Sequence, residues 1–216
     1  MPQNTQKLAH RYDLASTRWH SKINDFGFPA AYRQLIKTAL PRGGGANVID
    51  LGTGCGDFAL AYLTVQASPA KLTLLDISAK MLAVAETRIM GKMPVVNAHL
   101  GAIETLPPDV QFDTVICGHM IEHCPNPVQT LTEIYQRMLP GGVFVLAASK
   151  PHWCTALIQL IWRNKAFPPA KMINMLRQAG FEDIQHLPFA TGLPSRVSAG
   201  YTSIKSKRNI KCLSQS

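Results

Sequence analysis

Two histidines and a glutamate lie close together in the stretch GHMIEHCPNP, residues 118–127. Their order, His119, Glu122 and His123, has the spacing H-x-x-E-H, which is also a zinc-peptidase signature. A zinc site of that kind needs both histidines on one face of a helix. The two prolines of this stretch leave room for at most about two helical turns. We therefore predict no metal site, and we interpret Glu122 and His123 as structural residues of a short helix.

His119 is the candidate for proton transfer in this stretch. It directly follows a β-rich run, FDTVIC, and ligands of open α/β sheets bind at the carboxyl ends of the strands. An imidazole titrates near neutrality and can act as a general base. His20 and His152, which lie in segments that flank the core, are the alternative catalytic candidates.

A second group of candidate site residues, glycines and aspartates, lies in the stretch DLGTGCGD, residues 50–57. Glycines after a strand let the backbone turn sharply and approach a ligand. A nicotinamide fingerprint, G-x-G-x-x-G, fails here because the sixth position from Gly52 is Asp57. The carboxylates of Asp50 and Asp57 disfavour a pyrophosphate and favour a cationic or zwitterionic ligand. Asp76 ends the next β-rich run, where a carboxylate can bind both hydroxyls of a ribose.

The elements that must position these residues alternate along the chain. The β-rich runs are 46–51, 71–76, 95–100, 112–117 and 142–147, and helical patterns lie near 57–66, 78–90 and 126–139. This alternation predicts a parallel sheet with helices on both faces. After an apolar segment comes a helix that begins at Pro168-Pro169, and two last runs, DIQHLPFA and AGYTSIK, are expected to pair as a hairpin at one sheet edge.

The motifs and their order resemble those of class I S-adenosylmethionine-dependent methyltransferases, particularly the small-molecule branch that includes the ubiquinone/menaquinone methyltransferases. VIDLGTGCGDFAL is similar to the first motif, LLDISAKMLAVA to the acidic second motif, and FDTVICGHMIEH with LPGGVFVL to the later ones. MLRQAGFEDI is similar to the family's C-terminal helix and strand. The resemblance spans about residues 46–205. It implies an α/β, Rossmann-like fold whose mostly parallel seven-stranded sheet carries helices on both faces and a C-terminal antiparallel hairpin.

The resemblance also implies S-adenosylmethionine as the cofactor and assigns residues to it. Gly52 and Gly54 would lie along its methionine part, Asp50 would serve the amino group directly or through water, Asp76 would hold the ribose, and Ile77 would cover the adenine. The remaining implied contacts are Tyr12, Thr53, Met81, Ala102, Ile103, Cys117, Gly118 and His119. At Ala102 the family usually has an acid, so backbone groups of Ala102 and Ile103 are expected to serve the adenine.

Acceptor recognition is assigned to segments outside the cofactor motifs. We expect one methyltransferase domain over 1–216, with an N-terminal helical lid (1–42), a cofactor-binding core (43–150), a substrate lid with the hairpin (151–205) and a basic tail (206–216). An ordinary core helix is the alternative for 151–167. The aromatic residues of both lids favour a small apolar or aromatic acceptor. Together with the absence of an N/D-P-P-Y/F segment after the fourth strand, they argue against N-methylation of a nucleic-acid base or an amide. Whether O, N or C receives the methyl group is left open.

Composition restricts the class of protein. Hydrophobic residues make up 46% of the chain and charged residues 16%, which suits a sizeable core. The five scattered cysteines predict free thiols and a cytoplasmic location, and no apolar run suits a membrane span or a signal peptide. The net charge of +9 is concentrated in the two flanks, so contact with an anionic surface or nucleic acid is open. An RNA methyltransferase and a non-catalytic cofactor-binding protein are the alternatives, and the oligomeric state is not predicted.

Overall fold

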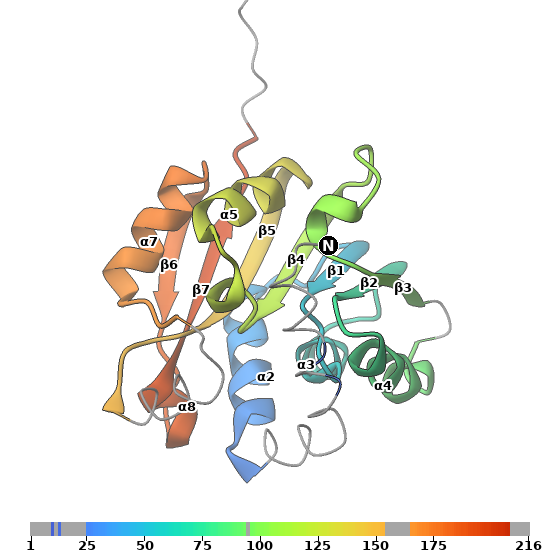
Figure 1. The fold of residues 1–216 in the computed structure, drawn as a ribbon, viewed down its shortest axis with the longest axis horizontal. Helices are drawn as coiled ribbons and strands as arrows, with labels where there is room; N and C mark the ends of the chain where they lie inside the picture. Colours follow the sequence, from blue (N-terminus) through green and yellow to red (C-terminus); the bar gives the residue numbers. More distant parts are fainter. Residues whose placement is uncertain (1–9, 11–12, 14–24, 94–95, 154–164, 208–216) are drawn as a thin grey trace, which may run out of the picture.

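A seven-stranded sheet forms the centre of the molecule in a computed structural model of the chain (Figure 1). The structure describes residues 10, 13, 25–93, 96–153 and 165–207. The strands are β1 (Asn47–Leu51), β2 (Lys71–Asp76), β3 (Val96–Leu100), β4 (Phe112–Gly118), β5 (Met138–Ser149), β6 (Glu182–Leu187) and β7 (Ser198–Ile204). Their order is β3-β2-β1-β4-β5-β7-β6, and β7 is the one strand of this sheet that runs in the direction opposite to the other six. The predicted fold class is confirmed.

Helices connect the strands at the places that the sequence pattern predicts. They are α2 (Phe28–Ala39), α3 (Asp57–Val65), α4 (Ala79–Met90), α5 (Pro127–Gln136), α7 (Pro169–Gln178) and α8 (Gly192–Val197), with short 3-10 helices η1 (Ile103–Thr105) and η2 (Ile121–His123). The side chains of Ser78 and Asn126 cap the first turns of α4 and α5 by accepting backbone N–H groups. Local capping therefore fixes where these two helices begin.

Strand β5 begins earlier than the sequence pattern predicts. The expected strand starts at residue 142, whereas β5 already pairs with β4 at Met138. The pairing then shifts between Phe112 and Thr114, and Gly141 has a φ of 79°. A glycine in this conformation lets the strand bulge and continue where a side chain would be strained.

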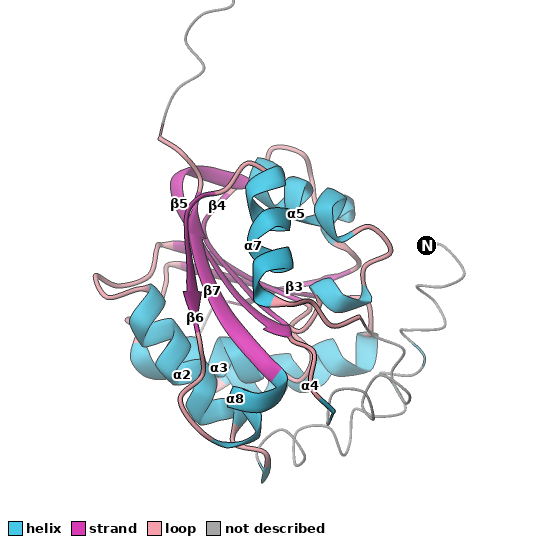
Figure 2. Cartoon of the chain, turned by 90° about the vertical axis from the view of Figure 1, so that its left-hand side faces the viewer, coloured by secondary structure: helices cyan, strands magenta, loops and turns pink. Residues whose placement is uncertain are grey.

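Helices cover both faces of the sheet (Figure 2). One hydrophobic cluster joins α5 and α7 to one face, and a second joins α2, α3 and α4 to the other. Strand β1 shows the alternation: Ile49 and Leu51 belong to the first cluster, and Val48 belongs to the second. Because both faces are buried, the edge at the carboxyl ends of the parallel strands is the place that remains for a ligand.

The two C-terminal strands pair as predicted, but the second of them lies inside the sheet. Strand β7 is inserted between β5 and β6, and the chain reaches it through α8. Since β7 is antiparallel to β5, its first residue, Ser198, pairs with Ser149, the last residue of β5. The reversed strand therefore brings its beginning to the edge where the parallel strands end.

Only part of the two predicted lids falls within the described residues. Helix α2 of the N-terminal stretch is core: its buried residues are Phe28, Ala31, Tyr32, Leu35 and Ile36. At the ends of the second stretch, Trp153 is 76% exposed and Phe167 is buried in the core. Residues 14–24 and 154–164 lie outside the described residues, so closure of a lid stays a prediction. Among the helices that the structure describes, none is long and apolar enough to cross a membrane.

Candidate functional site

The glycine-rich turn between β1 and α3 lies at the carboxyl edge of the sheet. Gly52 has a φ of 66°, and a Cβ atom there would lie 2.6 Å from the Cβ of Met120. Both facts require glycine at this position. The backbone N–H of Thr53 donates to the carbonyl of Leu75 at 3.0 Å, which ties the turn to β2. Gly54 has nothing within 4 Å of an added Cβ, so its backbone is open to a ligand.

Asp50 lies beneath this turn and is fully buried. Its Oδ2 accepts the hydroxyl of Thr53 at 2.8 Å and the N–H of Ala59 at 3.1 Å. Its Oδ1 is buried and has no donor among the described residues. Burial raises the pKa of Asp50 to about 7, although the hydrogen bonds from Thr53 and Ala59 act to lower it. An acceptor left without a donor costs about 1–3 kcal/mol, and a cationic N–H donor would satisfy it.

Asp76 ends β2 on the other side of the turn. Its Oδ2 accepts the N–H of Gly54 at 2.8 Å, and its Oδ1 accepts the N–H of Ser78 at 2.9 Å. Burial raises the pKa of Asp76, while these backbone hydrogen bonds act to lower it. A carboxylate offers about four lone-pair sites, so each oxygen keeps capacity for a further hydroxyl donor. Asp76 is thereby tied to the glycine turn and can still accept a diol.

The charge of Asp57 is balanced within the structure. Its Oδ1 lies 2.8 Å from Nη2 of Arg88, and Nη1 of the same side chain donates to the carbonyl of Cys55. The expected repulsion between Asp57 and a pyrophosphate is weakened by this ion pair. The negative character of the turn therefore comes from Asp50 and Asp76, and the preference for a cationic or zwitterionic ligand depends on them.

The residues predicted near the adenine divide into two groups. Ile77 and Ala102 are half-buried, just after β2 and β3. Met81 is fully buried, with its Sδ 3.3 Å from the Sγ of Cys55, and Ile103 belongs to the hydrophobic core. The side chains of Met81 and Ile103 thus support the site from within, and Ile77 and Ala102 lie nearer its surface.

The next group of predicted residues lies at the end of β4, beside the glycine turn. Cys117 pairs with Leu51 of β1 and is fully buried. Burial raises the pKa of the Cys117 thiol well above its ordinary value, so this thiol is a neutral part of the core. An added Cβ at Gly118 would lie 3.1 Å from Phe58. His119 then takes a φ of 57°, a left-handed conformation that is strained for a residue with a side chain.

His119 is the centre of a polar cluster at the ends of β4, β5 and β7. Its Nδ1 lies 2.9 Å from Oε1 of Glu122 and 3.3 Å from Oγ of Ser149. Its Nε2 lies 3.5 Å from Oγ of Ser198. The side chain of His119 is 23% exposed. The ring of Phe28 in α2 packs against it edge-on, with 5.4 Å between centroids.

Glu122 lies in η2 and is 1% exposed. Its Oε1 also accepts the backbone N–H of Ser149 at 2.7 Å, and its Oε2 is buried without a donor among the described residues. Burial acts to raise the pKa of Glu122. The hydrogen bond with His119 and the charges of His119 and His123 outweigh it, so the pKa is lowered. Glu122 is therefore an ionised carboxylate inside the protein.

The H-x-x-E-H motif does not form the helix face that a zinc site needs. His119 precedes η2, which is only three residues long, and His119 contacts Glu122 directly. Burial lowers the pKa of His123. Within the described ranges, no group of three His, Cys, Asp or Glu side chains is arranged to hold a metal ion.

The other predicted residues are placed as follows. His152 follows β5, and its ring packs near that of Trp153 with 5.6 Å between centroids. Tyr12 and His20 lie outside the described residues. The structure therefore brings His119 into a described polar cluster.

Sequence reasoning missed four partners of His119. They are Ser149, Ser198, Phe28 and Tyr32, whose ring centroid lies 6.3 Å from that of His119. Ser198 is 79 residues away along the chain. Ser198 could have been found by predicting that β7 lies beside β5 and is antiparallel to it, because an antiparallel β7 begins at the edge where β4 and β5 end.

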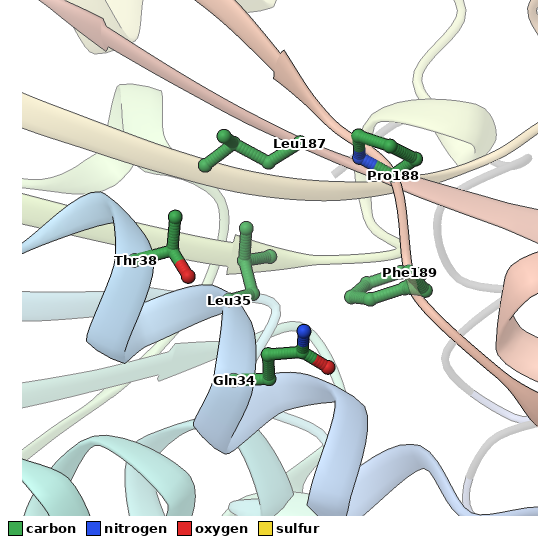
Figure 3. A pocket seen from close by; sticks show the side chains of 6 residues that line it. All are labelled: Gln34, Leu35, Thr38, Leu187, Pro188 and Phe189. Atoms are coloured by element: carbon green, nitrogen blue, oxygen red, sulfur yellow. The ribbon is translucent and has the colours of Figure 1, made fainter.

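A separate groove of about 210 Å³ lies between α2 and the end of β6 (Figure 3). It is lined by Gln34, Leu35, Thr38, Leu187, Pro188 and Phe189. None of these six is a predicted cofactor or catalytic residue. Leu35 follows Tyr32 by about one turn of α2, so this helix borders both the groove and the His119 cluster.

The chain was compared with known families and structures. The model of a methyltransferase domain matches residues 49–146. A ubiquinone/menaquinone biosynthesis C-methyltransferase of Rubrivivax gelatinosus is 31% identical over 206 residues, which cover 92% of this chain and 77% of that protein. A demethylmenaquinone methyltransferase of Symbiobacterium thermophilum is 30% identical over 154 residues, or 67% of this chain and 57% of that protein. Against three further relatives the chain spans 36%, 51% and 65% of their length.

Solved structures share the fold. The N-methyltransferase NodS of Bradyrhizobium japonicum in complex with S-adenosyl-L-homocysteine superposes with a TM-score of 0.74 at 16% identity, over 94% of this chain and 98% of that chain. A possible histamine N-methyltransferase of Thermotoga maritima superposes with a TM-score of 0.71 at 19% identity, over 91% and 99%. At these identities the likeness concerns the fold alone.

Proposed function

Since this chain belongs to the class I S-adenosylmethionine-dependent methyltransferase family that includes the ubiquinone/menaquinone C-methyltransferases, we propose that it methylates an O, N or C nucleophile of a small molecule. The observation that carries the proposal is the acidic, glycine-lined turn. There the buried Oδ1 of Asp50 has no donor among the described residues, and Asp76 is tied to the N–H of Gly54.

These residues fit S-adenosylmethionine, which when bound supplies an electrophilic methyl group on a cationic sulfur. Asp50 would accept a hydrogen bond from its ammonium group, directly or through water, and Asp76 would accept the ribose hydroxyls. The open space at Gly54 would admit the methionine part close to the backbone. Two carboxylates balance the positive charge of this ligand, whereas they would repel a dinucleotide pyrophosphate.

His119 is the catalytic residue in this proposal, ahead of His20 and His152. It follows β4 at the carboxyl edge and lies beside the glycine turn, because β4 pairs with β1. Alignment of nucleophile and methyl group can lower the barrier by roughly 7–11 kcal/mol at best, and a base is needed only for a protonated nucleophile. The aromatic rings of Phe28 and Tyr32 beside His119 favour an apolar or aromatic acceptor.

Location and wider contacts stay predictions within this proposal. Cys55, Cys117 and Cys124 form no disulfide within the part of the chain that the structure describes, which suits the predicted cytoplasmic location. The basic flanks would serve contact with an anionic surface or an anionic acceptor.

Calorimetry with S-adenosylhomocysteine and with NAD tests the proposal. We expect the purified protein to bind the first and not the second. Asp76→Ala removes a charged acceptor and should weaken S-adenosylhomocysteine binding about 10- to 100-fold, equivalent to ~1.5–3 kcal/mol. Asp183→Ala, at an exposed position of β6, is the control and should leave binding unchanged. Unchanged affinity in Asp76→Ala would contradict the ribose assignment.

A further inference from the structure

The contact between His119 and Glu122 determines which ring nitrogen carries the proton. An ionised carboxylate can only accept hydrogen bonds, and Oε1 of Glu122 lies 2.9 Å from Nδ1 of His119. Nδ1 must therefore be the protonated nitrogen that donates to Glu122. In the neutral imidazole, Nε2 is then the nitrogen with a free lone pair.

We propose that Glu122 is a positioning residue: it holds the proton of His119 on Nδ1 and turns Nε2 into the base for an acceptor whose nucleophilic hydroxyl arrives protonated. This inference rests on the proposed function and deepens it by naming the acceptor class, a phenol or enol rather than a thiol.

A purely structural role does not require the charge of Glu122. The N–H of Ser149, which donates to Oε1 at 2.7 Å, needs only an acceptor, and a glutamine would provide one. A buried carboxylate carries a large desolvation penalty, and one oxygen of Glu122 has no donor among the described residues. The charge is explained if it stabilises an imidazolium that forms when His119 takes a second proton.

The other titratable groups that face this pair remain neutral near neutral pH. Burial raises the pKa of Tyr32 in α2, of Cys117 in β4 and of Tyr201 in β7. Burial lowers the pKa of His123 in η2. Tyr32, Cys117 and Tyr201 therefore carry no charge that acts on this pair, whereas His123, when charged, also lowers the pKa of Glu122.

Nε2 of His119 faces the beginning of β7. Its contact with Oγ of Ser198 is 3.5 Å, the long limit of a hydrogen bond, so a hydroxyl of an acceptor can replace it. In the proposed step the O–H bond of the acceptor breaks and its proton goes to Nε2. The electron pair stays on the oxygen, which becomes the nucleophile, and the imidazolium later releases the proton to water. The contacts of Nδ1 with Glu122 and Ser149 and the packing of the Phe28 ring hold the imidazole in this orientation.

Nitrogen-15 NMR of the imidazole rings at pH 8 tests the tautomer, with His119→Asn used to assign the signals. In the wild type we expect the proton of His119 on Nδ1. In Glu122→Gln the amide oxygen can still accept from Ser149 and from Nδ1, but it carries no charge and is a weaker acceptor, so a larger fraction of the His119 rings should carry the proton on Nε2. Glu182→Gln, an exposed glutamate of β6, is the charge-matched control and should leave the spectrum unchanged. A wild-type proton on Nε2, or the same tautomer in Glu122→Gln, would overturn the proposal.

Turnover of two probes tests the acceptor class. Catechol needs a base, whereas thiophenol ionises readily without one. In Glu122→Gln we expect kcat with catechol to fall at least about tenfold and kcat with thiophenol to change less than about twofold. Equal losses with both probes would contradict the proposal. Calorimetry with S-adenosylhomocysteine separates the two hypotheses: if the wild type does not bind it, the proposed function fails, whereas the tautomer result concerns Glu122 alone.

Discussion

Replacing Asp50 by asparagine should make the protein more stable and at the same time impair cofactor binding. Burial raises the pKa of Asp50 from 3.8 to about 7, so the charged form destabilises the fold. Three pKa units correspond to about 4 kcal/mol. The amide keeps an acceptor for Thr53 and Ala59, but it places an unpaired NH₂ group where Oδ1 lacked a donor, which costs about 1–3 kcal/mol. The net gain at pH 8 is about 2 kcal/mol.

The raised pKa of Asp50 determines how the stability difference between Asp50→Asn and the wild type changes with pH. The folded protein holds a proton on Asp50 between pH 3.8 and about 7, where the unfolded chain has lost it. The contribution of Asp50 to the stability of the wild type therefore falls as the pH rises through this window and is constant above it. The amide that replaces the carboxyl group does not titrate, so the advantage of Asp50→Asn should be present at pH 8 and disappear near the lower end of the window.

Thermal unfolding at both pH values, with and without S-adenosylhomocysteine, measures both effects. A gain of about 2 kcal/mol corresponds to roughly 4–8 °C in Tm for a chain of this size. The ligand should raise the Tm of the wild type but hardly that of Asp50→Asn, because the neutral amide cannot balance an ammonium group. Asp113→Asn is the control for binding, since Asp113 accepts the N–H groups of Ala46 and Asn47 at the other end of β1. A less stable variant at pH 8, or one with unchanged affinity, would refute the reasoning.

Two further predictions concern the metal and the lid. Metal analysis should find no stoichiometric zinc, and a chelator should leave methyl transfer intact; activity that disappears with the chelator and returns with zinc would show that His119 and His123 are ligands. Trp153→Ala should weaken acceptor turnover and leave S-adenosylhomocysteine affinity nearly unchanged, since the indole is 76% exposed and follows the carboxyl end of β5. Limited proteolysis of the N-terminal segment should slow when the cofactor is bound, and equal rates with and without it would argue against a lid.

The glycine turn could be predicted from the sequence because its geometry is local. Gly52 and Gly54 follow a β-rich run directly, and Asp76 ends the next run, so adjacent parallel strands bring them together. The predicted strands and helices depend on the same local signals. The start of β5 was missed because the bulge around Gly141 is stabilised by pairing with β4, which no local pattern encodes.

The surroundings of His119 could not be predicted in the same way. Ser149 and Ser198 are ordinary residues in the sequence, and they become neighbours only because β7 enters the sheet in reverse. The interpretation of Glu122 as a structural residue stays a prediction, and the motif itself gives no sign of the burial of Glu122 or of its contact with His119. The role of Asp57 was overstated because its partner, Arg88, lies 31 residues further along the chain.

The strand order also separates two sets of site residues between two halves of one sheet. Strands β1, β2 and β3 carry the glycine turn and both site carboxylates, whereas β4, β5 and β7 bring together His119, Ser149 and Ser198. The halves meet at a single seam, where Leu51 lies beside Cys117. We therefore expect substitutions around Ser149 and Ser198 to alter acceptor turnover more than cofactor affinity. A chimera joined in the loop before β4 would retain the glycine turn with its two carboxylates and exchange the strands that carry His119, Ser149 and Ser198. The loop before β4 is therefore a suitable junction for changing acceptor specificity.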